Sequence, residues 1–404
     1  MASAAAAQAG NEVCLLEKNE KAGKKIYITG KGRCNVTNAC DFEIFLRNIC
    51  SGTKFLYSSL RAFGPAEMMN YLEENGCRLK TERGNRVFPV SDHASDVTRA
   101  LVYAASAKNV SFRYQTEVKS IKKTADVFLV YAEENGKRVC FEADRVIVCT
   151  GGMSYPGTGS TGDGYRFAES FGIKVTSLYP SLVSMKTEED TSSLSGISLK
   201  NIRLTLRRCS DLKKITEEEG ELLFTHSGIS GPLVLSASAV ISPMLGNGEK
   251  FLACIDLKPA LDEKTLDSRI LRDLAEARNS DMGNALSGLL ISGIRQKVLR
   301  ESGISPSMKA HDLTRKERLK LVSMVKALPF TVYGTGGFEE AVVTKGGIEL
   351  AEINPSTMEA KRIPGLYFAG EVLDVDGLTG GFNLQLAWTT GTAAGKAAGR
   401  TSGS

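Results

Sequence analysis

The chain has 404 residues, more than one compact core usually holds, which indicates roughly two or three domains. Hydrophobic residues make up 42% and charged residues 24%, values that exclude a disordered or a collagen-like chain. The net charge of +5 comes from 51 basic and 46 acidic residues, so the bulk composition gives no reason to expect a nucleic-acid partner. No segment approaches the roughly 18 consecutive apolar residues of a membrane span, and none is predicted.

Cysteine usage indicates a reduced, cytoplasmic setting. The nine cysteines are an odd number and none belongs to a C-x-x-C pair, so neither a disulfide framework nor a zinc ribbon is expected. Cys34 has its nearest neighbour at Cys40, which is not the spacing of a redox-active pair. Asp374 and Asp376 lie in a turn rich in glycine and aspartate, which explains them without a metal, so no metal site is predicted.

The first seventeen residues match the second half of a Rossmann unit. Residues 1–10 are good helix formers closed by a glycine, and residues 12–17 form a short apolar strand ending in Glu17. In a Rossmann fold, an acid at this position bonds the ribose hydroxyls and lies roughly 20 residues after the phosphate-binding glycine loop. We therefore expect the first strand and its loop to be encoded upstream of Met1. The alternative for this segment alone is an ordinary helix and strand with a surface glutamate.

Glycines and basic residues dominate residues 23–38. A short apolar strand at 26–28 is predicted to lead into a loop that carries Arg33 and Asn35. Such a loop can offer backbone N–H groups and a cation to an anionic cofactor. The alternative is a basic turn capped by asparagine.

A hairpin and a buried strand follow in the next hundred residues. Residues 113–142 alternate in polarity around the turn signal Asn135–Gly136. Residues 144–152 then form a continuous apolar strand that runs into Thr150 and Gly151, typical of a parallel sheet whose carboxyl edge binds ligands. The G-x-G-x-x-G match at 157–162 has no acid about 20 residues later, so we interpret it as a flexible loop beside a ligand.

Two changes of composition delimit an insertion. Residues 1–175 are predicted as the first part of a nucleotide-binding domain, 176–260 as a β-rich insertion, 261–329 as a helical insertion, and 330–404 as the return to the first domain. In this last segment a buried strand enters the turn at Gly370, and a helix begins near Gly381. Free backbone donors at that helix start favour negative charge on a ligand.

Several motifs together resemble the BaiN/YhiN family of FAD-dependent oxidoreductases, relatives of the glutathione-reductase-type flavoproteins. The resemblance covers nearly the whole chain and is carried by residues 16–18, 30–35, 86–89, 223–232 and 368–381. It implies an α/β fold in which a Rossmann-like FAD-binding domain is formed by both chain ends and interrupted by a β-rich and a small helical insertion.

The resemblance also implies the ligands of FAD. Glu17 would hold the adenosine ribose, and the backbone of Val118 would meet the adenine. Arg33 and Asn35 would flank the cofactor. The full predicted set is Glu17, Lys18, Arg33, Cys34, Asn35, Val118, Thr150, Gly151, Gly370, Glu371, Asp374, Gly380, Gly381, Phe382, Asn383 and Leu384.

The implied chemistry is reduction of a C=C bond conjugated to a ketone, driven by NADH or NADPH through FAD. The implied substrate is a hydrophobic small molecule such as a 3-oxo-4,6-diene bile acid or steroid. Tyr155 and His226 are the candidate proton donors. The alternative for Tyr155 is packing, and the alternative for His226 is a structural bond from its ring to the backbone at 228–232.

Two other classes of function remain open at this point. One is a flavin oxidase of a small amine such as aminoacetone, which would release peroxide and need no NAD(P)H. The other is a non-catalytic flavin-binding or RNA-associated protein, which mild basicity alone supports. The sequence leaves the oligomeric state open.

Overall fold

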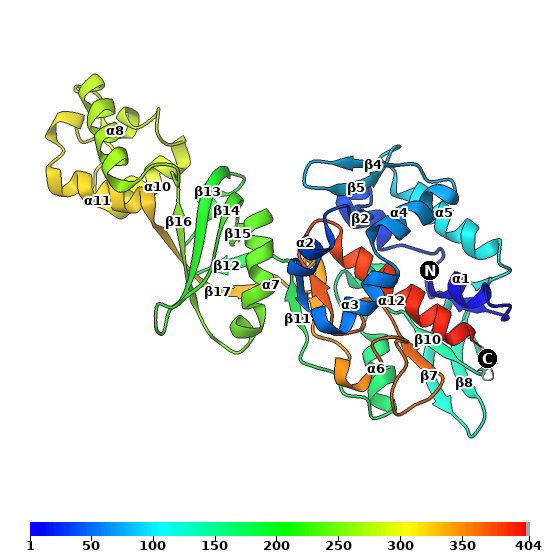
Figure 1. Ribbon diagram of the computed structural model, residues 1–404. Helices are drawn as coiled ribbons and strands as arrows, with labels where there is room; N and C mark the ends of the chain where they lie inside the picture. The colour runs from blue at the N-terminus through cyan, green and yellow to red at the C-terminus, as the bar shows by residue number, and fades with distance from the viewer. Residues whose placement is uncertain (401–404) are drawn as a thin grey trace. The chain divides into compact units, whose positions relative to one another are not determined.

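The computed structural model describes residues 1–400, which form two compact units (Figure 1). The first unit combines Met1–Ser181 with the chain from Gly337 onward, and the second unit is Leu182–Gly336. The chain thus leaves the first unit, forms the second and returns. The predicted fold class is confirmed: both chain ends build one α/β unit, and the interruption contains a β-rich and a helical part.

Two pairs of parallel strands form the Rossmann-like part of the first unit. Strand β1 (Cys14–Leu16) pairs with β6 (Ser111–Arg113), and β10 (Val146–Val148) pairs with β19 (Leu366–Phe368). All of β19 is buried, as expected for a sheet covered on both faces. Helix α1 (Ala2–Ala7) packs so closely on α12 (Phe382–Gly399) that a Cβ on Gly395 would clash with the carbonyl of Ala2.

Small antiparallel sheets and helices make up the rest of the first unit. The meander β7–β8–β9 turns at Asn135 and Gly136, which both have positive φ, so the predicted hairpin is confirmed. Its strands are β7 (Thr116–Lys123), β8 (Phe128–Glu134) and β9 (Lys137–Ala143). A second three-stranded sheet has the order β2 (Thr37–Asn38), β5 (Arg86–Pro89), β4 (Leu79–Glu82). Two further sheets are strand pairs: β3 (Ile49–Ser51) with β20 (Asp376–Gly377), and β11 (Tyr179–Ser181) with β18 (Val343–Lys345). The helices are α2 (Phe42–Arg47), α3 (Thr53–Ala62), α4 (Pro65–Glu74), α5 (Ala94–Ser106), α6 (Asp163–Ser170), η2 (Pro156–Thr158) and η5 (Leu350–Glu352).

The strand predicted at residues 26–28 is wrong. These residues begin the 3-10 helix η1 (Ile26–Gly32), whose chain bends at Gly30, where φ is 56°. The N–H of Ile26 bonds the carbonyl of Gly23 at 2.8 Å, and the N–H of Ile28 bonds the carbonyl of Lys25 at 3.3 Å. Both bonds are local, and an apolar run this short does not distinguish a strand from a turn by its periodicity.

The second unit is a closed barrel with attached helices. The strand order is β12-β15-β14-β13-β16-β17, and one hydrophobic core runs from barrel residues such as Phe251 to helix residues such as Ile270. The strands are β12 (Met185–Thr187), β13 (Ser198–Arg208), β14 (Lys214–Thr225), β15 (Gly228–Ser230), β16 (Phe251–Asp256) and β17 (Leu328–Thr335). The helices are α7 (Pro232–Gly246), α8 (Glu263–Glu276), α9 (Met282–Ala285), α10 (Ser292–Ser302), α11 (Arg315–Lys326), η3 (Ser192–Leu194) and η4 (Ala310–Asp312). Within residues 1–400, no helix combines the length and apolar character that a membrane crossing requires.

Candidate functional site

Two loops that follow paired parallel strands lie at the centre of the candidate site. Strands β10 and β19 are in register at Val148 and Phe368, so residues 149–155 and 369–371 leave the same edge of the sheet. The N–H of Ala369 bonds the carbonyl of Val148 at 3.0 Å, which holds the two chains together there. Open α/β sheets bind their ligands at such carboxyl ends.

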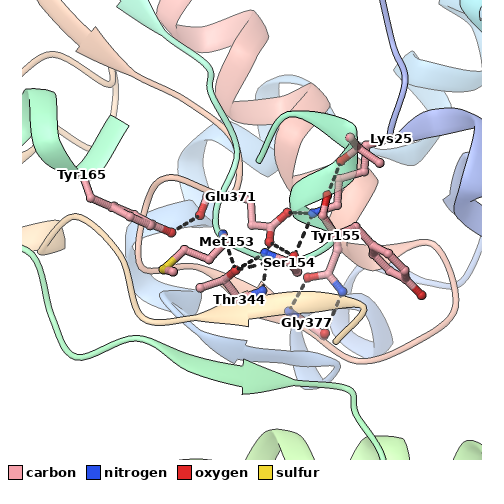
Figure 2. Close-up of polar contacts among 10 residues, drawn as sticks. Lys25, Met153, Ser154, Tyr155, Tyr165, Thr344, Glu371 and Gly377 are labelled. Carbon is pink, nitrogen blue, oxygen red and sulfur yellow. Dashed lines mark hydrogen bonds and ion pairs between the residues drawn. The ribbon is translucent and has the colours of Figure 1, made fainter. Parts of the chain in front are cut away.

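Glu371, a predicted cofactor ligand, is the centre of a polar network at this edge (Figure 2). Its Oε1 accepts from the hydroxyl of Ser154 at 2.6 Å and from the backbone N–H of Thr344 at 2.9 Å. Its Oε2 accepts from the ammonium of Lys25 at 2.7 Å, which also donates to Ser154 Oγ at 2.8 Å. Ser154 is fully buried, whereas the side chains of Lys25 and Glu371 are 25% and 18% exposed. One carboxylate thus joins three distant segments.

Thr344 and Gly152 fix the loop that carries Ser154. The hydroxyl oxygen of Thr344 accepts from the N–H of Met153 at 2.8 Å and from the N–H of Ser154 at 3.1 Å. A Cβ on Gly152 would lie 2.5 Å from that oxygen and 2.9 Å from Oε1 of Glu371. Position 152 therefore needs glycine, because any side chain would displace the network.

Helix α12 begins with free backbone donors and is bonded further along to the turn that follows β19. The N–H of Gly370 bonds the hydroxyl of Thr390 on α12 at 2.9 Å, which ties the turn to the helix. Gly380 and Gly381 have φ of 125° and 100°, and a Cβ on Gly381 would clash with the carbonyl of Thr37. The first-turn N–H groups, those of residues 382–384, have no acceptor within the helix. These groups give the N-terminal end of the helix a positive partial charge, which favours binding of an anion.

Among the predicted ligands, Asn35 and Thr150 each carry a buried polar atom without a hydrogen-bond partner in the described part of the chain. Oδ1 of Asn35 and the hydroxyl of Thr150 are buried and have no hydrogen-bond partner within residues 1–400. Asn35 Oδ1 lies 3.0 Å from the place where a Cβ on Gly381 would stand, so it faces the start of α12. Buried polar atoms in folded proteins are nearly always paired with protein groups or ordered water, so an unpaired one calls for an explanation. Together with the glycine turns and helix donors, they fit a large polar anion such as FAD.

The two residues predicted to bind adenosine, Glu17 and Val118, lie directly after β1 and within β7. Oε1 of Glu17 accepts from both the backbone N–H and the side-chain amide of Asn19, at 2.9 and 2.8 Å. The pairing of β7 with β8 shifts register between Val118 and Ser120, so the backbone at Val118 borders a bulge. A bulge frees backbone groups from the strand ladder, which suits the predicted backbone contact to adenine.

Two predicted ligands bond protein carboxylates in this structure. The ammonium of Lys18 contacts Asp163, at the start of α6, at 2.7 Å. The guanidinium of Arg33 bonds Glu82 at 2.9 Å and Asp92 at 3.1 Å. Their role as cofactor ligands stays a prediction.

Cys34 is buried and Asp374 is half-buried, and both have raised pKa values. Burial raises the pKa of the Cys34 thiol to about 12, so this thiol stays protonated at neutral pH. Burial also raises the pKa of the Asp374 carboxyl, although a hydrogen bond from Thr176 at 3.3 Å opposes the shift. Cys34 therefore contributes packing and backbone to the site, not a reactive thiolate.

The two candidate proton donors belong to different units. Tyr155 lies in the first unit with φ of 51°, and its N–H bonds the carbonyl of Phe338 at 3.0 Å. His226 is exposed at the end of β14 in the second unit, where its carbonyl accepts from the hydroxyl of Thr191 at 3.3 Å. A role in proton transfer stays a prediction for both.

Sequence reasoning missed Lys25, Ser154 and Thr344. Lys25 and Glu371 are separated by 346 positions, so no local spacing signals their ion pair. The position of two of these residues in the sequence could have indicated them. Lys25 belongs to the glycine-flanked basic loop, and Ser154 closely follows the strand whose end was predicted to bind a ligand.

Glycine turns that follow the carboxyl ends of parallel strands are typical of dinucleotide-binding sites of the Rossmann type. The family model described as HI0933-like protein Rossmann domain matches residues 1–397, and the chain belongs to this family. The predicted resemblance is thereby confirmed, and the chain is a Rossmann-fold flavoprotein oxidoreductase.

Relatives and a solved structure extend this result. The chain is 32% identical to the 3-dehydro-bile acid delta(4,6)-reductase of Clostridium scindens, over 98% of this chain and 95% of that one. It is also 32% identical to the ribosomal RNA dihydrouridine synthase of Escherichia coli, over 96% and 92% of the two chains. The 3-ketosteroid delta1-dehydrogenase of Sterolibacterium denitrificans shares the fold at a TM-score of 0.51, with 12% identity over 98% and 96% of the chains.

Proposed function

We propose that the protein uses NADH or NADPH and FAD to reduce a C=C bond conjugated to a carbonyl in a hydrophobic substrate such as a 3-oxo-4,6-diene steroid. The observations that carry the proposal are the Glu371 network at the edge of β10 and β19 and the buried, unpartnered Oδ1 of Asn35 that faces the start of α12. The bile-acid reductase that matches this chain end to end supports the choice of reaction.

The chain's own residues would bind and orient the reactants. Bound FAD supplies the two-electron chemistry between NAD(P)H and the double bond. The amides at 382–384 would stabilise negative charge on the cofactor, and Asn35, Thr150 and Glu371 would accept its hydrogen bonds. The substrate's β-carbon gains a hydride equivalent while Tyr155, the candidate in the first unit, gives a proton to the α-carbon.

The test is anaerobic reduction of the FAD-loaded protein, followed by addition of one oxidant at a time. We expect NADH or NADPH to bleach the flavin and a conjugated steroid dienone to restore its colour, with the reduced steroid as product. Reoxidation by oxygen with peroxide release and no need for NAD(P)H would instead indicate the amine oxidase class. A protein that stays colourless in excess FAD would overturn the proposal.

A uracil base in RNA is the second candidate substrate. Its C5=C6 bond is conjugated to a carbonyl, so the same chemistry applies, and the Escherichia coli relative is named for this product. The small net charge of the whole chain also conceals a local excess of positive charge: residues 261–329 contain thirteen Lys and Arg but nine Asp and Glu. The predicted absence of a nucleic-acid partner is therefore not supported.

One helix of that region carries unusual charges. Arg315 and Lys316 occupy the first turn of α11, where the helix dipole disfavours cations, and Lys320 follows one turn later. All three are exposed, and none has a carboxylate partner within residues 1–400. Such a surface suits phosphate groups. Adding a uridine-containing RNA fragment to the reduced protein, beside the steroid, separates the two candidates by product.

A further inference from the structure

The Lys25–Glu371 pair leaves one acceptor position on the carboxylate. A carboxylate offers about four lone-pair sites. Ser154 and Thr344 occupy Oε1, and Lys25 occupies one site of Oε2. The remaining site lies on a side chain that is 18% exposed, so an incoming hydroxyl or N–H can reach it. Figure 2 shows Lys25 approaching this carboxylate from a separate segment.

The charges around this edge require compensation. FAD brings a doubly negative pyrophosphate, and the segment that follows β19 carries Glu371, Asp374 and Asp376. Asp376, which is 1% exposed, has its own cation in Lys345 at 3.1 Å. The Asp374 carboxyl accepts a hydrogen bond from the hydroxyl of Thr176 at 3.3 Å. For Glu371 the cation within residues 1–400 is Lys25, so Lys25 decides whether this edge repels an anion.

We propose that Lys25 is a positioning residue of the cofactor site, which neutralises Glu371 and fixes its carboxylate so that the edge of β10 and β19 accepts anionic FAD. The inference rests on the proposed function, because it assumes that FAD occupies this edge. Lys25 acts through Glu371, whose fixed oxygen then receives a donor from the cofactor. The Ser154 hydroxyl completes the network because it accepts from the lysine and donates to the carboxylate.

The test measures FAD affinity by quenching of flavin fluorescence in the full-length protein. Lys25→Met should weaken FAD binding about tenfold, because a partly buried carboxylate loses its counter-charge. Lys25→Arg should retain most of the affinity. The double variant K25M/E371Q should recover affinity relative to K25M, because the glutamine keeps the bonds from Ser154 and Thr344 without the negative charge.

The matched control is Lys24→Met, which removes a neighbouring lysine whose contacts with Glu20 and with Oδ1 of Asn19 are both long, at 3.4 Å. K24M should bind FAD like the wild type, and thermal melts should show that K25M is folded. Wild-type affinity in K25M would overturn the inference. Equal affinities of K25M and K25M/E371Q would also overturn it. If Lys25 mattered only through its shape, removing the negative charge of Glu371 would not restore FAD affinity. Failure of the wild type to bind FAD would refute the proposed function instead.

Discussion

The chemical reactivity of single residues at this site depends on their burial more than on their residue type. Cys34 belongs to a motif that signals the family, yet its thiol is completely buried beside Cys77 in one hydrophobic cluster. A cysteine is reactive through its thiolate, and burial disfavours that charged form. Cys34 therefore contributes packing at this position, and no thiol chemistry is needed for the proposed reaction.

This leads to a prediction about the pH dependence of stability. The pKa of Cys34 is about 12 in the folded chain against an ordinary 9.0, so the folded state holds this proton more tightly. The resulting stability is present below pH 9.0 and is lost as the pH rises toward 12. Urea unfolding should show this loss in the wild type, and Cys34→Ala should lack that component.

Labelling provides the matching measurement on the native protein. Iodoacetamide at pH 8 should leave Cys34 unmodified and should modify the exposed Cys140, as read by peptide mass spectrometry. Rapid labelling of Cys34 in the folded chain would contradict the burial argument.

Residues of the site were predictable only where local pattern marks them. Asn35, Glu371 and Gly381 lie in glycine-rich motifs that the sequence displays directly. Lys25 and Thr344 act through contacts with residues far away in the chain, such as the bond from Thr344 N–H to Glu371. No spacing rule reports such a contact, because it exists only once the chain ends fold together.

At the scale of elements, patterns longer than a turn were predictive. The hairpin and the last helix formed, since each has a run of apolar or alternating residues bounded by glycines. The strand predicted over 144–152 is shorter and only partly buried, because β10 spans Val146–Val148 and Cys149 is exposed. The apolar run at 26–28 became part of η1 because local backbone bonds satisfied it. The pairing of β10 with β19 joins residues 146 and 366, which sequence periodicity does not specify.

The start of α12 yields an element-scale prediction. Gly381→Ala should lower the free energy of unfolding by about 3 kcal/mol, because φ is positive and the new Cβ meets the carbonyl of Thr37. Gly76→Ala is the matched control: its φ is 87° but nothing lies within 4 Å, so it should cost about 1 kcal/mol. Urea denaturation measures both. Equal losses would show that the close approach to Thr37 contributes nothing.

At the scale of the whole molecule, average composition concealed the arrangement of charge. The net charge of +5 over 404 residues predicted no anionic polymer as partner. The helical region nevertheless has an excess of cations, and three of them project from α11 without carboxylate partners among the residues described. If RNA uracil and a steroid dienone undergo the same reaction at the flavin, the cofactor site would not distinguish them. The exposed cations of α11 would then favour RNA.

The salt dependence of RNA binding tests this role of the α11 cations. Arg315→Gln with Lys316→Gln should lower RNA affinity and reduce the slope of log affinity against log salt by about 1.4, because each lost phosphate contact on single-stranded RNA contributes about 0.7. Lys137→Gln with Arg138→Gln is the matched control, since it removes two exposed cations from β9 of the first unit. FAD binding and reduction of a small dienone should be unchanged in both variants. If the two pairs changed the slope equally, the cations of α11 would have no special role, and the hydrophobic enone would stand as the substrate class.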